Sequence, residues 1–173
     1  MSSSDLSAGF PPIESSGARI LILGSLPGQA SIDAQQYYAH PRNAFWPIMR
    51  GLTGAGGDYG ERCQRLASSG IAVWDVLQQS VRPGSLDSSI RMDTATPNDF
   101  GPFFERHLEL QMIAFNGRKA QDLFNRLVLS ELPRTAKTAL LPSTSPAHAS
   151  MTAAAKREVW RGILGPNLKG VIQ

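Results

Sequence analysis

Four short apolar runs, separated by longer segments of helical character, constrain what this chain can fold into more than any other feature. Near-continuous apolar runs of this length are typical of strands that are buried on both faces of a parallel sheet. The alternation of such strands with helices is the pattern of an α/β protein. We therefore predict an α/β fold whose sheet is covered on both faces, with strands over residues 19–23, 71–76, 110–115 and 138–141.

The segments between these strands predict helices. Residues 118–129 carry their apolar side chains at i, i+3 and i+4 spacing, which is the pattern of one buried helix face. Ser150 is expected to cap the last helix. The polar segment 79–98 has no strong period, so we predict an ordered surface loop there. The predicted helices cover residues 43–52, 59–69, 99–108, 118–129 and 152–164.

Length and composition favour a single domain. A chain of 173 residues can bury a sizeable core, and contents of 42% hydrophobic and 18% charged residues are typical of globular proteins. Residues 1–17 are rich in Ser, Gly and Pro, and we predict a flexible leader there, followed by one domain over 18–173. No apolar run approaches the roughly 18 residues that cross a bilayer, so we expect no membrane association. We also expect a monomer.

The cysteine and histidine counts restrict the chemistry. Cys63 is the single cysteine, which excludes an internal disulfide and an all-cysteine metal site and favours a cytoplasmic location. The three histidines, His40, His107 and His148, are too scattered to indicate a metal site by spacing. A net charge of +3 and a pI near 9.4 are compatible with a phosphate-bearing partner.

Each predicted strand ends in a turn or a polar side chain. The turn 24–28 follows the first strand, Asp75 lies at the end of the second, and Asn116 and residues 142–146 follow the third and fourth. Ligands of parallel sheets bind outside the carboxyl ends of the strands, so we expect these four features at one rim. The turn 24–28 lacks the lysine of a Walker loop and the third glycine of a dinucleotide fingerprint.

Residues 37–46 combine four aromatic side chains with an amide, an imidazole and a guanidinium. Aromatic side chains can stack a flat polar ring, which is worth about 1–3 kcal/mol for each base. Alternatively, Phe45 and Trp46 only begin a core helix. Asn43 is suited to orienting a water molecule, and equally to capping the helix that follows it. These residues leave both alternatives open.

Asp75 and the loop 141–148 offer further polar groups. A carboxyl group at the end of a buried strand must be hydrogen-bonded or have a raised pKa. Both conditions suit a side chain that reads a base edge, and equally one that bonds a loop backbone. The hydroxyl-rich loop can contact phosphates, and its small apolar tip can wedge into a base stack. In isolation the same loop is typical of Ser capping, and the turn 82–87 is either support for a loop or, as its composition favours, a plain surface turn.

Taken in order, these motifs resemble the uracil-DNA glycosylase superfamily, and within it most closely the hypoxanthine-DNA glycosylase branch, or DNA-deoxyinosine glycosylases. The resemblance implies a three-layer α/β/α sandwich around a four-stranded parallel sheet, without cofactor or metal. It also implies a monofunctional glycosylase that flips a deaminated base, hypoxanthine above all, out of DNA and hydrolyses its N-glycosidic bond to leave an abasic site. The segments that carry it are 21–28, 37–46, 70–76 with 82–90, 113–117 and 141–149.

The sequence departs from the uracil-specific branches at three positions. Leu26 stands before the Pro of the first motif, where those branches carry an Asp or Asn that activates water. Leu141 stands where the best-known uracil enzymes carry His, and Asp75 where they carry a base-reading Asn. The resemblance to the hypoxanthine branch therefore implies that Asn43, in Pro-Arg-Asn-Ala-Phe-Trp, takes over the catalytic role.

The resemblance implies a role for each candidate residue. Asn43 orients the water, and His148 stabilises either the leaving group or a phosphate. The base is stacked by Phe45, read at its edge by Asp75, and bound by Ser25, Leu26, Tyr38 and Asn116. The flanking DNA is contacted by Gly28, Ser143, Ser145, Pro146 and Ala147.

Three other functions stay open at this point. One is a broad or uracil-directed glycosylase, and another is a non-catalytic protein that recognises damaged DNA, which the loss of an acid at Leu26 allows. The third is an α/β enzyme that acts on a small nucleotide or sugar. The absence of a Walker lysine and of an acidic ribose-reading residue after Gly28 counts against this last class.

Overall fold

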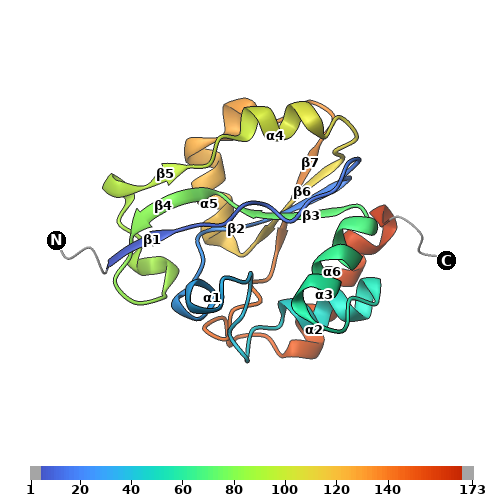
Figure 1. The fold of residues 1–173 in the computed structure, drawn as a ribbon, viewed down its shortest axis with the longest axis horizontal. Coiled ribbons are helices and arrows are strands. Elements are labelled where there is room, and N and C mark those ends of the chain that lie inside the picture. The colour runs from blue at the N-terminus through green and yellow to red at the C-terminus, as the bar shows by residue number, and fades with distance from the viewer. Residues whose placement is uncertain (1–4, 169–173) are drawn as a thin grey trace.

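The structure, a computed structural model, describes residues 5–168. At its centre lies a parallel sheet of four strands, β2 (Ile20–Gly24), β3 (Ile71–Asp75), β6 (Met112–Asn116) and β7 (Lys137–Leu141). Their order across the sheet is β3-β2-β6-β7 (Figure 1). Every residue of β2 and β3 is buried, which is why these strands appear in the sequence as unbroken apolar runs. The predicted four-stranded parallel sheet is confirmed.

Helices cover both faces of this sheet. On one face Trp74 of β3 packs against Phe100 and Phe103 of α4, and Phe115 of β6 packs against Phe124 of α5. On the other face lie α2, α3 and α6; Figure 1 shows α4 above the strands and α3 and α6 below them. The predicted three-layer sandwich is therefore confirmed. The helices are α2 (Phe45–Thr53), α3 (Tyr59–Ser68), α4 (Phe100–Arg106), α5 (Arg118–Leu127) and α6 (Ala153–Leu164).

The order of the strands creates a crevice. The chain passes from β2 to β3 on one side and then crosses back to β6 on the other side of β2. This reversal is a topological switch point. At such a point the connections that leave the carboxyl ends of two neighbouring strands run to opposite sides, and a crevice forms between them. The segments that follow β2 and β6 therefore flank an opening at the carboxyl edge of the sheet.

The segment 79–98 differs from the predicted surface loop. It contributes to a second, antiparallel sheet of three strands, β1 (Leu6–Ala8), β4 (Leu77–Val81) and β5 (Thr96–Pro97). In β4 only Leu77 and Ser80 are buried, so no apolar alternation marks the strand in the sequence. Backbone pairing with β1 and the hydrogen bond between the Ser80 and Thr94 hydroxyls hold it instead.

The predicted flexible leader also needs correction over its described part, residues 5–17. Besides the pairing of β1 with β4, Ile13 exchanges two backbone hydrogen bonds with Val73. Glu14 accepts hydrogen bonds from Arg106 and from the buried side chain of His107. These contacts attach residues 5–17 to the sheet and to α4, so they belong to the domain. Residues 1–4 of the predicted leader lie outside the described range.

Two local differences concern helices. A short helix that the sequence did not predict, α1 (Gln29–Ala34), follows the turn after β2. The cap of α6 is Thr152 rather than Ser150, because the Thr152 hydroxyl accepts a hydrogen bond from the backbone N–H of Ala155. Within residues 5–168 no helix has the length and apolar character that a membrane span requires.

Candidate functional site

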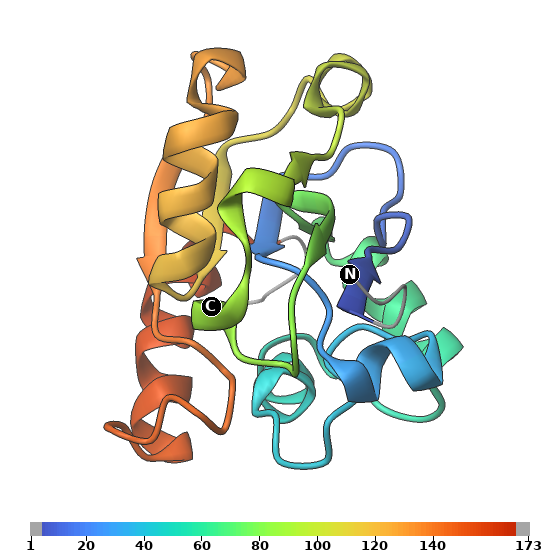
Figure 2. The ribbon, with the colours of Figure 1, turned by 90° about the vertical axis from the view of Figure 1, so that its left-hand side faces the viewer.

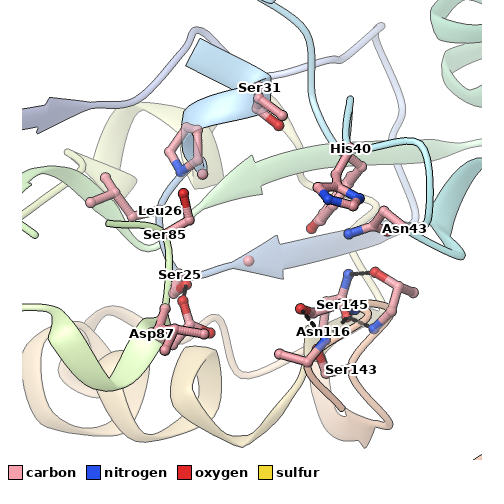
Figure 3. Close-up of a pocket in the computed structure, with 18 of the residues that line it drawn as sticks. Ser25, Leu26, Ser31, His40, Asn43, Ser85, Asp87, Asn116, Ser143 and Ser145 are labelled. Carbon is pink, nitrogen blue, oxygen red and sulfur yellow. Dashed lines mark hydrogen bonds between the residues drawn. The ribbon is translucent and has the colours of Figure 1, made fainter. Parts of the chain in front are cut away.

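A pocket of about 510 Å³ opens at the carboxyl ends of the central strands, a volume in the range of ligand-binding sites. Its walls come from the four features expected at one rim, together with residues 37–43 and 82–88. Figure 3 shows Ser25 and Asp87 on one side of it and Ser143, Ser145 and Asn43 on the other. The predicted site residues that line it are Ser25, Leu26, Gly28, Tyr38, Asn43, Asp75, Asn116, Ser143, Ser145, Pro146, Ala147 and His148.

The floor of the pocket is formed where Asp75 and Tyr38 approach Gly24. A Cβ atom added to Gly24 would lie 2.5 Å from Asp75 Oδ1 and 2.9 Å from Tyr38 Oη, so only glycine fits at the end of β2. The Asp75 side chain is almost fully buried, and among the described residues neither its Oδ2 nor Tyr38 Oη has a hydrogen-bond partner. Buried polar atoms are nearly always bonded. These two line a pocket, so they are available to a ligand.

Phe45 lies beneath this floor, not in the pocket wall. Its side chain is 0% exposed, and its ring stacks on that of Tyr38 with a centroid distance of 4.1 Å. The Tyr38 backbone adopts a left-handed conformation with φ of 54°, which non-glycine residues seldom adopt. Phe45 also meets the edges of Trp46 and Trp160. The predicted direct contact of Phe45 with a base does not fit this geometry, and Tyr38 is the aromatic residue that lines the pocket.

Asn43 precedes the N-cap residue of α2, which is Ala44, and it lines the pocket. Its Oδ1 accepts a hydrogen bond of 2.9 Å from the backbone N–H of Phe45, at the start of α2. This bond fixes the side chain, and Figure 3 shows the amide directed from that helix toward the pocket. The bond to the start of the helix thus holds the amide in place, and the orientation of a water molecule by Asn43 stays a prediction.

Two histidines lie at the pocket. His148 is half-buried, and its Nε2 lies 3.4 Å from the Ser150 hydroxyl. His40, which the sequence analysis did not select, lines the wall next to Asn43, and its Nδ1 accepts a hydrogen bond of 3.1 Å from the backbone N–H of Arg42. A bond of this kind places the ring proton of a neutral His40 on Nε2. The only available sequence signal was its position in the 37–46 motif.

The loop that follows β7 is held by buried polar groups. Both ends of the Asn116 amide bond Thr144, with Nδ2 donating to its hydroxyl and Oδ1 accepting from its backbone N–H, each at 2.9 Å. The Lys156 ammonium donates to the carbonyl of Ser145. Asn116 thus positions the loop and also lines the pocket, and its predicted contact with a base stays a prediction.

The turn 82–87 supports the opposite wall. The side chain of Arg82, 1% exposed, donates to the backbone carbonyls of Leu26 and Pro27. Its Nη1 also lies 3.7 Å from Asp87 Oδ1, which accepts a hydrogen bond of 2.5 Å from the Ser25 hydroxyl. The plain surface turn that the composition favoured is therefore wrong. The hydrogen bonds to Leu26, Pro27 and Ser25 join residues far apart in the sequence, so no local sequence pattern indicates them.

Comparison with known proteins identifies the family. The family model of the uracil DNA glycosylase superfamily matches residues 11–164. The chain belongs to the uracil DNA glycosylase superfamily. The family and the class of enzyme predicted from the sequence, a DNA glycosylase, are thereby confirmed, and DNA is the substrate.

Two relatives of this superfamily member come from Methanosarcina species. It is 36% identical over 115 residues to the hypoxanthine DNA glycosylase of Methanosarcina barkeri and 40% identical over 115 residues to that of Methanosarcina acetivorans. Each alignment covers 65% of this chain and 72% of the relative. A solution NMR structure from M. acetivorans, described as a candidate uracil DNA glycosylase, superposes with a TM-score of 0.78 at 33% identity, covering 93% of this chain and 98% of that one.

The first motif of this glycosylase has no acidic group that faces the pocket. Leu26 lines the pocket with a buried side chain, and its backbone carbonyl is held by Arg82. No cluster of three or more His, Cys, Asp or Glu suited to a metal ion occurs within residues 5–168. Polar groups that are available for chemistry at the pocket floor and wall include Asp75, Tyr38, Asn43, His40 and His148.

The electrostatics of Asp75 lead to a stability prediction. The pKa of the Asp75 carboxyl is raised from 3.8 to about 7; burial is the largest cause, the nearby Asp87 carboxylate adds to it, and the Arg82 guanidinium opposes both. Between these values the carboxyl is protonated in the folded chain and ionised in the unfolded one. The contribution of Asp75 to the free energy of unfolding therefore falls as pH rises through this window, by about 1.4 kcal/mol per pH unit, and is constant above it.

Asp75→Asn removes this titration. The stability of the variant relative to the wild-type chain is expected to increase from about pH 4 to about pH 7 and to stay level above that. Urea unfolding of both proteins at several pH values across this window measures the difference. Parallel pH profiles for the two proteins would contradict a protonated Asp75.

Proposed function

We propose that this chain excises hypoxanthine from DNA by hydrolysis of the N-glycosidic bond and leaves an abasic site. The observation that carries the proposal is the pair of unpartnered polar groups, Asp75 and Tyr38, buried at the floor of the pocket beside Gly24. The names of the Methanosarcina relatives support hypoxanthine as the base.

The protonation state of Asp75 fits a deaminated base. With its pKa raised to about 7, mainly by burial, the carboxyl group is about half protonated near pH 7, and the protonated form offers one O–H donor and a carbonyl acceptor. Deaminated bases present an N–H next to a C=O group, which is the complementary pattern. Tyr38 supplies a second hydroxyl at the same floor and a ring face that is backed by Phe45. This arrangement supports recognition of hypoxanthine, and it also accepts the related edges of xanthine and uracil.

Excision begins with flipping of the nucleotide, which costs a few kcal/mol of unstacking. Bond cleavage then builds positive charge on the sugar and negative charge on the departing base. A deaminated purine leaves more readily than adenine, because its ring stabilises that charge or is readily protonated. The protein has to hold the base and to orient one water molecule. Asn43, fixed by its bond to Phe45 N–H, is the group that we propose for the water.

The remaining lining residues have supporting roles in this proposal. Ser143 and Ser145 contact phosphates that flank the flipped nucleotide. His148, at the end of the same loop, assists the leaving group or a phosphate. Asn116 and Arg82 position the walls. We propose that the protein acts as a monomer in the reducing cytoplasm, which is consistent with its single free cysteine, Cys63.

The test uses duplexes that carry one hypoxanthine, xanthine or uracil, or no lesion. Cleavage of abasic sites with alkali reports excision, and a binding titration is run on the same duplexes. Strand breaks with hypoxanthine are expected. Breaks with uracil alone would replace the proposal by a uracil-directed enzyme, and lesion binding without breaks would replace it by a non-catalytic damage-binding protein. The absence of both strand breaks and lesion binding would overturn the proposal altogether.

A further inference from the structure

One exposed apolar side chain at the pocket has no role in the proposed excision as described so far. Among the described residues, Leu86 is the one pocket-lining member of the exposed large apolar side chains, with 56% of its surface accessible. The others do not line the pocket: Leu6, Leu108, Leu129 and Val159. Exposed leucines are common on protein surfaces, but one at the mouth of a site is a candidate for contact with the substrate.

The backbone that carries Leu86 is anchored on both sides. Ser85, immediately before it, accepts a hydrogen bond of 2.9 Å from the backbone N–H of Gln29. Asp87, immediately after it, accepts the short hydrogen bond from Ser25 and lies beside the buried Arg82. Figure 2 shows this part of the chain, in light green, between α5 and α1. Leu86 is therefore exposed to solvent on a fixed loop. Insertion of its side chain between bases would require no ordering of that loop.

The loop on the other side of the pocket has a different tip. Residues 143–148 face the Ser25 and Asp87 wall across the opening (Figure 3), and their apolar tip consists of Pro146 and the exposed Ala147. These two side chains are small beside the space that a purine leaves in a base stack. Leucine is among the apolar side chains that proteins insert between base steps to unstack them.

We propose that Leu86 inserts into the base stack next to the flipped nucleotide, from the side of the pocket opposite to residues 143–148. The proposal rests on the proposed excision of a flipped base from duplex DNA. Leu86 fills space vacated by the purine while the Pro146–Ala147 tip contacts the strand from the other side. The duplex is then held open by two loops, of which the one with Leu86 supplies the larger apolar group. This role is needed in a duplex and dispensable where no stack has to be opened.

The experiment compares duplex and single-stranded DNA. Leu86→Ala is expected to slow single-turnover excision of hypoxanthine from a duplex by about tenfold or more, since unstacking is costly, and to leave excision from a single strand unchanged. Leu86→Met, which keeps a long apolar side chain, is expected to retain duplex activity. Leu108→Ala is the matched control, because Leu108 is exposed and does not line the pocket.

A second readout does not depend on catalysis. 2-Aminopurine placed next to the lesion becomes brighter when its stack is opened, and this rise on binding of wild-type protein is expected to shrink with Leu86→Ala but not with Leu108→Ala. An unchanged rise, or an equal loss of excision on duplex and single strand, would overturn the role of Leu86. If the wild-type chain binds and unstacks the lesion but releases no base, the proposed activity fails while the fluorescence series still decides the role of Leu86.

Discussion

Replacing Asn43 by Ala is expected to lower the single-turnover rate of hypoxanthine excision by on the order of 10²–10⁴-fold, the range that loss of a positioned proton-transfer or water-orienting group produces. Asn43 is the polar side chain that the helix start holds in the pocket wall, and Leu26 leaves no acid in the first motif to substitute for it. Affinity for the lesion duplex is expected to change little, because Asp75 and Tyr38, which we propose hold the base, are unchanged. Rates and binding are measured on the same duplex.

The structural part of this effect has its own control. Asn43→Ala also removes the hydrogen bond to Phe45 N–H, which is worth about 1 kcal/mol for a helix start. Asp58→Ala removes a comparable bond at the start of α3, where Asp58 accepts from Glu61 N–H, and Asp58 does not line the pocket. Asp58→Ala is expected to lose similar stability and to keep its activity. Equal and small losses of activity in the two variants would make Asn43 a helix cap and no more.

Gly24→Ala is expected to have the second large effect. The new methyl group would collide with Asp75 Oδ1 at 2.5 Å and Tyr38 Oη at 2.9 Å. Both side chains are packed in the interior, so displacing them is expected to cost about 1–3 kcal/mol of stability. Because the displaced groups are those proposed to hold the base, excision is expected to fall by about 100-fold or more, as a misplacement of about 1 Å in a site can produce. Chemical unfolding and single-turnover excision measure the two effects.

A second glycine provides the comparison. Gly51, in α2, has no atom within 4 Å of an added Cβ, and alanine is favoured over glycine inside a helix by about 1 kcal/mol. Gly51→Ala is expected to be as stable as the wild-type chain or more so, with unchanged activity. A Gly24→Ala variant that excises hypoxanthine at the wild-type rate would show that the Asp75 and Tyr38 floor does not hold the base.

The central sheet was predictable because its strands are buried on both faces. Such strands must be largely apolar, as 20–24 and 71–74 are, and the same topology gathers the ends of the strands at one rim. The second sheet was not predictable by the same signal. Its strand β4 buries only Leu77 and Ser80 and is held by backbone pairing with residues 6–8, and neither feature produces a period in the sequence.

The sequence predicted most of the residues that line the site, but it predicted their individual contacts less well. Motif order brought nearly every candidate to the pocket, but the division of labour depends on contacts between distant residues. Phe45 was expected to face the base, but it is buried beneath Tyr38, and the Tyr38 ring lines the pocket. Asn116 is engaged by Thr144, and Ser25 by Asp87. The last two pairings have no local sequence signature, since they join residues 28 and 62 positions apart in the chain.

The central claim is that this chain releases hypoxanthine from DNA by means of Asn43. The most direct measurement is chromatographic quantification of free hypoxanthine from a duplex with a single lesion, incubated with excess wild-type protein or Asn43→Ala. The account predicts one free base per duplex with the wild-type chain, an equal yield of alkali-labile sites, and a rate lower by on the order of 10²-fold or more with the variant. Binding of the lesion without any free base, or release at the same rate by Asn43→Ala, would contradict it.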